Sequence, residues 1–274
     1  MPKPSSGTLF WILGSLILFI VAPVINSSHP RYAWLLTLVM MIIFSMSVGY
    51  AINGRLNGIF IDYRNRLSLS KLQALCWSML ILSALYTAAL LRIENEVTDP
   101  LEITLNTPLL TIMGISLASL AAAPAILNAK ADNNVTAQAA QQVSQAINKP
   151  VEDIIPAGKI FSFSSAELAS WLDLFRGEEN TNAGSADLGK IQQFVITFIL
   201  LAVYAYFLWH SFFPYALPKN PDANWLKTLP PVSDSMSWLL GISHAGYLAY
   251  KAAPHGESST APSSTNNTTS SGAG

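Results

Sequence analysis

The chain has 274 residues, of which 51% are hydrophobic and only 11% charged, and its formal net charge is −1. Soluble domains carry about 25% charged residues, so this composition excludes an ordinary soluble protein. The net charge gives no basic surface for nucleic acid, and the single Cys76 excludes an intrachain disulfide or a cysteine metal site.

Apolar runs that could cross a membrane follow one another along the chain. A helix of about 20 residues spans a hydrocarbon core of roughly 30 Å. Five runs meet or approach this length and a sixth is shorter; they cover residues 8–25, 33–52, 72–91, 108–127, 191–213 and 236–252. The sequence predicts an all-α, polytopic membrane protein with six transmembrane helices, the sixth of them short.

The N-terminal segment, residues 1–67, contains two of these helices and a basic loop. Its first apolar run is longer than the core of a secretory signal and has no clear cleavage site, so we interpret it as a retained helix. Positive charge in short loops marks the cytoplasmic side. The loop after the second run holds Arg55, Arg64, Arg66 and Lys71, whereas the loop after the third holds only Arg92 among four acids. Both termini are therefore predicted to be cytoplasmic.

Two segments of the chain repeat one pattern. SLSKLQALCW (68–77) aligns with DLGKIQQFVI (187–196), and IMGIS (112–116) aligns with LLGIS (239–243). Ser68 and Asp187 are predicted N-caps of outgoing helices, and each is followed by a returning helix that contains GIS. We interpret residues 68–127 and 187–253 as parallel copies of one two-helix hairpin.

Small residues recur in the two returning helices. Spaced four apart, they line one helix face and let another backbone approach closely, which also favours a homo-oligomer. The predicted helix-packing residues are Gly114, Ser116, Ala118 and Ala122 in the first copy and Gly241, Ser243, Ala245 and Ala249 in the second.

The region between the two copies, residues 128–186, is a predicted cytoplasmic insertion. Ser164 and Glu167 have the spacing of a capping box, which predicts an amphipathic helix over 165–176. Its apolar face consists of Leu168, Trp171, Leu172 and Phe175. This face could dock on the bundle, lie in the membrane interface or bind a protein partner, and its acidic polar side counts against a membrane interface. The final segment, 254–274, is predicted to be disordered.

The repeated motifs resemble those of uncharacterised bacterial inner-membrane proteins. These proteins carry a hairpin with the pattern LS[RK]xQ followed by GIS, seen here as LSKLQALCW and LLTIMGIS and again as LGKIQQF and WLLGIS. The second copy departs from the pattern at Gly189 and Ile196. The resemblance covers about half of the chain and implies a bacterial inner membrane location, but no activity.

A few polar residues in the predicted helices are candidates for function. His244 replaces Leu117 of the first copy, and it has either a structural hydrogen-bonding role or a role in a pore or switch. Gln73 and Gln192 either bond across a helix interface or line a cytoplasmic vestibule. We interpret the acids Asp173, Glu178, Glu179 and Asp187 as part of a solvated connection, and Asp62 with Arg64 and Arg66 as a surface pair.

The sequence contains no recognised catalytic or metal-binding motif, so no cofactor, metal or catalytic residue is predicted. The favoured hypothesis is a non-enzymatic membrane scaffold or anchor that presents its cytoplasmic region to a protein partner. The alternative is an oligomeric channel or pore-forming subunit. A small-solute transporter is less favoured, because transporters usually show broken helices or intramembrane carboxylates.

Overall fold

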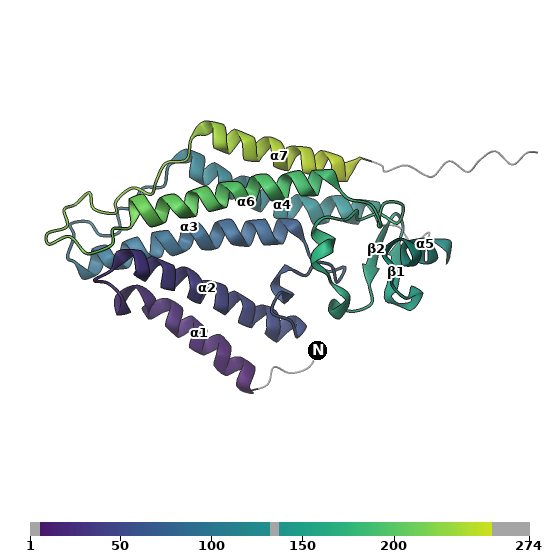
Figure 1. The fold of residues 1–274 in the computed structure, drawn as a ribbon, viewed down its shortest axis with the longest axis horizontal. Helices are drawn as coiled ribbons and strands as arrows, with labels where there is room; N and C mark the ends of the chain where they lie inside the picture. Colours follow the sequence, from purple (N-terminus) through teal and green to yellow (C-terminus); the bar gives the residue numbers. More distant parts are fainter. Residues whose placement is uncertain (1–5, 132–136, 254–274) are drawn as a thin grey trace, which may run out of the picture.

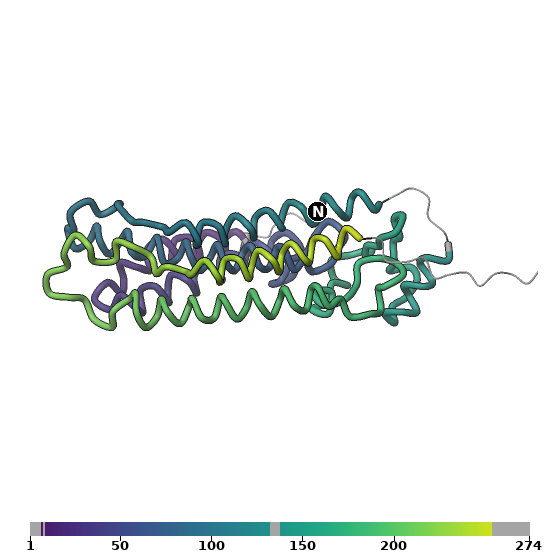
Figure 2. Tube along the Cα trace, turned by 90° about the horizontal axis from the view of Figure 1, so that it is seen from above, coloured from purple at the N-terminus to yellow at the C-terminus, as the bar shows by residue number. Residues whose placement is uncertain are grey.

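Helices make up most of the structure, a computed structural model that describes residues 6–131 and 137–253. The longer helices run lengthwise, and α5 lies at one end (Figures 1 and 2). In chain order they are α1 (Ser6–Ile25), α2 (Pro30–Asn53), α3 (Leu69–Glu94), α4 (Thr107–Lys130), α5 (Ala137–Ile147), α6 (Leu188–Phe207) and α7 (Asp234–Ala252). A π-helical turn, Leu208–Phe212, continues α6. The predicted disordered tail lies outside the described residues.

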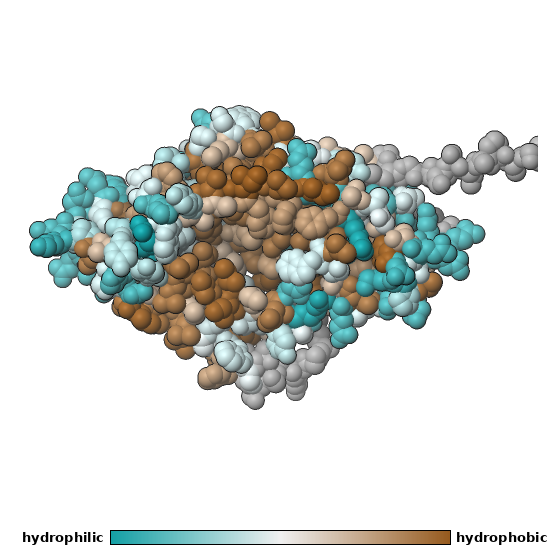
Figure 3. All heavy atoms as spheres, viewed as in Figure 1, coloured by the Kyte–Doolittle hydropathy of each residue, from teal (hydrophilic) through white to brown (hydrophobic). Residues whose placement is uncertain are grey.

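Four of the described helices are long and apolar enough to cross a membrane. They are Pro30–Asn53, Leu69–Glu94, Thr107–Lys130 and Leu188–Phe212, the last being α6 with its π-helical turn. The apolar part of α1, Leu9–Ile25, is shorter. On the face drawn in Figure 3, hydrophobic residues cover the middle of the molecule and hydrophilic ones cover both ends. The chain is thus a helical protein with the surface of a membrane protein.

Helix α3 occupies the centre of the bundle. In its apolar part 56% of the residues are buried, compared with 17% in α2, 28% in α4 and 33% in α6. The returning helices α4 and α7 pack on each other, and α2 packs on both α1 and α3. The core between these helices contains large side chains, among them Trp34, Trp77, Leu80, Tyr204 and Leu240. Since such side chains fill the space between α2, α3, α6 and α7, the bundle is packed as a solid body.

The helices α3 and α6 begin in the same way. The side chain of Ser68 accepts a hydrogen bond from the backbone N–H of Lys71, and that of Asp187 accepts one from the N–H of Lys190. Each satisfies one of the N–H groups that a helix leaves free in its first turn. Both predicted N-caps are therefore present, and each opens a helix that is followed by a returning helix.

One end of the bundle carries a compact unit, which we call the head and which consists of residues 54–68 and 137–187 (Figure 1). It contains an antiparallel hairpin of β1 (Ile154–Ala157) and β2 (Ile160–Phe163), with Ile154 paired to Phe163. Gly158 in the turn has φ of 58°, which glycine adopts without strain. The all-α prediction missed this hairpin, because four-residue strands leave too short a pattern to recognise.

The head has a small hydrophobic core of its own. Val143 and Ile147 of α5 pack against Ile154, Phe161 and Phe163 of the hairpin. The opposite end of the bundle consists of two connections, residues 95–106 and 213–233, which we call the loop end. They are joined by a bridge between Thr104 and Thr228.

The segment 165–176 differs from its prediction. In place of one amphipathic helix it forms two short 3-10 turns, Ala166–Leu168 and Trp171–Leu174. The predicted capping box of Ser164 and Glu167 is replaced by one six residues further on, formed by Ser170 and Asp173.

The physical reason is a break in the backbone between the two turns. Ala169 and Ser170 have ψ of 135° and 148°, which is extended and not helical. Arg55 holds this conformation, since its Nη1 donates to the carbonyls of Ala166, Glu167 and Ala169 at 3.0, 2.8 and 2.9 Å. A long-range contact thus overrides the helical spacing of the apolar residues.

Candidate functional site: a buried charge cluster

Glu178 is the centre of a cluster of charged side chains between the head and the helix bundle. Its Oε1 lies 2.9 Å from Nη2 of Arg64 and 3.3 Å from Nζ of Lys190, and its Oε2 pairs with Nζ of Lys251. These cations come from the 54–68 loop, the first turn of α6 and the last turn of α7. One carboxylate therefore joins three separate segments of the chain.

The loop segment is shaped by Asp62. Its Oδ1 accepts the backbone N–H groups of Arg64 and Arg66, and its Oδ2 accepts Nε and Nη2 of Arg64 at 3.1 and 2.9 Å. Asn65, at the tip, has φ of 57°, a conformation that asparagine tolerates better than most residues. The turn presents the Arg64 guanidinium to Glu178. The side chains of Arg64 and Arg66 are each 1% exposed, so this is no surface pair as the sequence suggested.

Arg66 connects the loop to the rest of the head. Its Nη2 donates to the carbonyl of Gly177 at 3.0 Å and lies 3.8 Å from Oδ1 of Asp173. The guanidinium carbon lies 4.4 Å from the centre of the Phe161 ring, a distance typical of a cation–π contact. The hairpin strand β2 is thereby attached to the cluster.

Lys190 fixes the start of α6 to the head. Besides its contact with Glu178, its Nζ donates to the carbonyls of Asp173 and Arg176 at 3.0 and 2.8 Å. Its backbone N–H is bound by the N-cap Asp187, so both ends of this residue are held. The first turn of α6, a helix long and apolar enough to cross a membrane, is thus attached to the folded head.

A second ion pair extends the cluster to α4. Nζ of Lys130 pairs with Glu179 and donates to the carbonyls of Lys251 and Ala253. The cluster then has equal numbers of basic and acidic members: Arg64, Arg66, Lys130, Lys190 and Lys251 against Asp62, Asp173, Glu178, Glu179 and Asp187. Since the charges balance, their burial requires no additional ion.

The electrostatics of the cluster follow from this arrangement. Burial alone would raise the pKa of the Glu178 carboxyl, but Lys190, Lys251 and Arg64 outweigh burial and hold it well below its usual range. Burial opposes the charge of Arg64, yet Glu178 and Asp62 raise its pKa. Burial and the neighbouring Arg64 lower the pKa of Arg66. Glu178 is therefore a stably ionised structural carboxylate with both oxygens occupied.

The two predicted glutamines, Gln73 of α3 and Gln192 of α6, differ in burial. Gln73 is buried, and its Nε2 donates to Oγ1 of Thr197 at 2.9 Å. Its Oε1 accepts from Nε2 of Gln193 at 2.8 Å, while Gln192 is exposed. Gln193 thus takes the interhelical role that the sequence suggested for Gln192, because it lies on the helix face that carries Thr197.

His244 lies in the contact between α4 and α7. It is 2% exposed, and its Nδ1 is 2.5 Å from Oγ of Ser119. Among the described residues of α4 and α7, Nε2 of His244 and the hydroxyls of Ser116 and Ser243 are buried without a hydrogen-bond partner. Buried polar atoms of this kind are usually paired with ordered water.

The small residues predicted for packing are divided by the structure. Ser116 and Ser243 are buried between helices, and Gly241 has one close neighbour, the side chain of Ile115. The others are exposed or half-buried within this chain: Gly114, Ala118, Ala122, Ala245 and Ala249. A Cβ added at Gly114 would meet nothing within 4 Å. Most of the small-residue face is therefore free on the outside of the bundle.

The four apolar residues of segment 165–176 also point in different directions. Leu168 packs against the core of the head, and the ring of Phe175 lies 5.0 Å from that of Phe194 on α6. Trp171 and Leu172 are 54% and 51% exposed. Two of the residues thus dock inward, and two remain on the surface.

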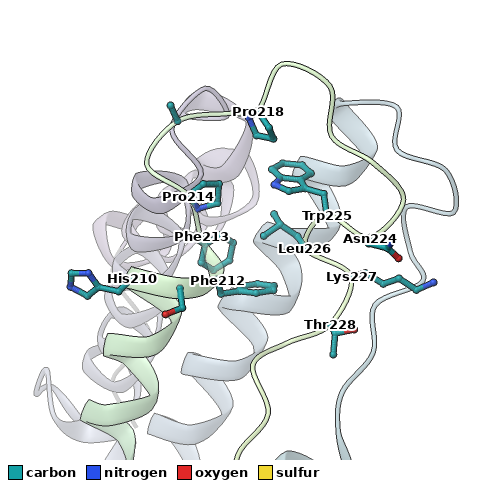
Figure 4. Close-up of a pocket in the computed structure, with 12 residues that line it drawn as sticks. His210, Phe212, Phe213, Pro214, Pro218, Asn224, Trp225, Leu226, Lys227 and Thr228 are labelled. Carbon is teal, nitrogen blue, oxygen red and sulfur yellow. The ribbon is translucent and has the colours of Figure 1, made fainter.

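A cavity of about 640 Å³ lies at the loop end, between the end of α6 and the 213–229 connection (Figure 4). Phe212, Phe213 and Leu226 line it, while His210 and Lys227 lie at opposite edges. Lys227 pairs with Glu102 at 2.9 Å. In the described part of the chain no group of His, Cys, Asp and Glu could hold a metal ion.

No family model, no curated protein and no solved structure matches the chain. The charge cluster was missed by sequence reasoning because its partners are distant in the chain; Arg64 and Glu178, for example, are 114 residues apart. The available signal was the gathering of acids and bases next to the ends of apolar helices, where unpaired charge is costly.

Proposed function

We propose that this protein is a non-enzymatic, multi-pass scaffold of a bacterial inner membrane that presents its head to a cytoplasmic protein partner. The observation that carries the proposal is the Glu178 cluster, which ties the head to α6 and α7 by buried ion pairs. A head on a flexible linker would need none of these contacts. Ordering a surface before a partner arrives lowers the entropic cost of binding it.

The distribution of basic residues supports a cytoplasmic head. Ten of the fifteen Lys and Arg residues belong to the head or to the helix ends beside it: Arg55, Arg64, Arg66, Lys71, Lys130, Lys149, Lys159, Arg176, Lys190 and Lys251. The loop end and the helix ends beside it have four: Arg31, Arg92, Lys219 and Lys227. Positive charge is retained on the cytoplasmic side, so the head is assigned to it.

The same proposal includes six transmembrane helices arranged around two repeated hairpins. The 19 residues of α7 would extend about 28 Å, close to the thickness of a hydrocarbon core. Its buried face carries Ser237, Ser243, His244, Tyr247 and Lys251, whereas Trp238 and Ile242 are exposed. Polar residues on the inner face lower the mean hydropathy of a helix without exposing charge to lipid.

A partner surface is available on the head. Val151 and Ile155 lie close together in the chain, and they are 42% and 51% exposed. Exposed apolar residues on a rigid unit are the usual centre of a protein interface, although most such residues on this protein belong to the lipid-facing bundle.

The test is photo-crosslinking of the full chain in its native membrane. A crosslinking residue at Val151 or Ile155 should form an adduct with one cytoplasmic protein, and the same residue at exposed Leu101 of the loop end should not. The substitution Glu178→Gln should weaken the adduct while the helices stay inserted. Identical adducts from Ile155 and Leu101, or none from either head position, would argue against a scaffold.

An oligomeric channel is the second candidate, favoured by the small residues on the outside of α4 and α7. Gly114 and Ala118 are exposed, and close contact between copies would cover them. Because the core of the bundle is filled, a conducting path would have to run between copies. Purified protein in planar bilayers would then give single-channel steps, and silence across voltage and pH would exclude a pore.

A further inference from the structure

The turn Trp171–Leu174 lies at the level where the helix bundle meets the head. Arg55, two residues beyond the end of α2, binds the carbonyls just before this turn. Phe175, just after it, packs on Phe194 in the second turn of α6. Figure 1 shows this stretch between the helix ends and the β-hairpin. The turn is therefore held at the end of the membrane-spanning region.

The turn exposes its apolar side chains and buries its charged one. Trp171 and Leu172 are about half exposed, whereas Asp173 is 2% exposed and lies against Arg66. A turn that faces water shows the opposite pattern, because apolar surface is favoured inside and a carboxylate outside. This pattern suits an apolar or amphipathic environment next to Trp171.

Two leucines at the helix ends that meet the head are also exposed. Leu56, which follows α2, and Leu188, which begins α6, are 57% and 74% exposed at the same level. They continue the exposed apolar surface of the helices onto the head. Tryptophan is enriched where a membrane protein crosses from hydrocarbon to headgroups, since its ring is apolar and its N–H is polar.

Of the two acids that the sequence places on segment 165–176, Glu167 is exposed before the turn, whereas Asp173, within the turn, is buried. Asp173 is the only acid between Ala169 and Gly177, and it is occupied by the Ser170 N–H and by Arg66. The turn therefore presents no negative charge that would repel anionic lipid.

We propose that Trp171 and Leu172 insert into the boundary between headgroups and acyl chains, as an interfacial anchor that fixes the orientation of the head on the membrane. The bound partner is the lipid surface itself, in contact with two side chains held by a rigid turn. The anchor does not depend on the scaffold role, because it follows from the position of the turn at the ends of α2 and α6. With Trp171 and Leu172 in the lipid, the surface around Ile155 is the part of the head that remains free to bind a protein partner.

The test measures depth in lipid nanodiscs of phosphatidylethanolamine and phosphatidylglycerol. A spin label at Leu172→Cys, in the Cys76→Ser background, is compared with labels at Lys159→Cys on the hairpin turn and Ile199→Cys on the exposed face of α6. The ratio of collisions with oxygen to collisions with a nickel chelate should be severalfold higher at 172 than at 159. The ratio at 172 should stay below the ratio at 199, which faces the hydrocarbon core. Equal ratios at 172 and 159 would overturn the proposal.

A second measurement avoids labelling. Lipids brominated near the headgroup should quench the fluorescence that Trp171→Phe removes from the total of seven tryptophans. If that part of the fluorescence is unquenched in nanodiscs, the lipid anchor is refuted. If the label at 172 becomes protected only after a cytoplasmic extract is added, the surface binds a protein and the lipid anchor is likewise refuted.

Discussion

The two ends of the helix bundle are held by different kinds of buried contact. At the head, charges from several segments meet at Glu178. Beside the loop end, Arg92 is fully buried and has no carboxylate partner among the described residues; its guanidinium donates to the carbonyl oxygens of Thr98, Asp99, Pro100, Ala223 and Trp225. The buried cations of the head have carboxylate partners, whereas the buried Arg92 is satisfied by backbone carbonyls.

This difference has consequences for specificity and for pH. Backbone carbonyls are present whatever the sequence, so Arg92 requires only the path of the two loops. The head requires particular acids and bases, each of which leaves a buried charge behind if its partner is lost. The head should therefore be the end that responds to substitution of acids and to low pH.

The largest expected effect comes from Glu178→Gln. It leaves Arg64, Lys190 and Lys251 without their common anion, and breaking a buried pair costs about 3–5 kcal/mol. Hydrogen exchange should show faster exchange throughout the 154–163 hairpin. The matched control is Glu152→Gln, an exposed acid of the head, which should change little. Equal protection in both variants would show that the cluster does not hold the head.

A somewhat smaller effect is expected at the other end from Arg92→Lys. The ammonium keeps the charge but cannot reach carbonyls on two loops at once, and hydrogen bonds to a charged group contribute about 1.5–3 kcal/mol. Exchange should rise in 98–104 and 223–229 and stay unchanged in the head. Lys227→Met, which removes a partly exposed ion pair at the same end, should cost less than about 1 kcal/mol.

The response to pH should separate the two ends without mutation. The pKa of Glu178 is lowered in the folded protein, so its contribution is complete above the unfolded value of about 4.3 and is lost as pH falls below it. Proteolysis of the head with an acid-active protease should accelerate below about pH 4 and not between pH 5 and 8. The loop end should show no such step, and Glu178→Gln should abolish the step at the head. Faster proteolysis of the head already near pH 6 would contradict the assignment to Glu178.

How far the sequence predicts this structure depends on the distance over which each contact acts. The N-caps Ser68 and Asp187 could be read correctly, because a cap bonds only three residues ahead. The apolar runs predicted helices for the same reason. The prediction of a helix over 165–176 was wrong although the apolar residues have helical spacing, because Arg55 and the local cap at Ser170 break the helix.

The charge cluster could not be predicted from one sequence, because nothing local indicates that Glu178 will meet Arg64 or Lys251. The sequence reading took these acids for a solvated loop, and the structure buries them. At α6 the sequence reading named Gln192 for a possible contact across a helix interface, but the residue that bonds Gln73 is Gln193, which lies 100° further around the helix.

The smallest effect is expected from His244→Leu, which copies the residue at the aligned position of the first hairpin. It removes the bond to Ser119 and also a buried nitrogen without a partner, and the Ser119 hydroxyl can bond to its own helix backbone. The thermal stability in detergent should change by about 1 kcal/mol or less. A much larger loss, with Ser119→Ala harmless, would indicate that His244 binds something beyond Ser119.

The rigid attachment of the head is tested most directly by one distance measurement. Spin labels at Lys159→Cys on the head and Leu110→Cys on the exposed face of α4, in the Cys76→Ser background, report the separation of head and bundle in nanodiscs at pH 7. The buried cluster predicts a single narrow distance distribution that broadens in Glu178→Gln. A distribution that is already broad with Glu178 present, and unchanged by its substitution, would contradict the account.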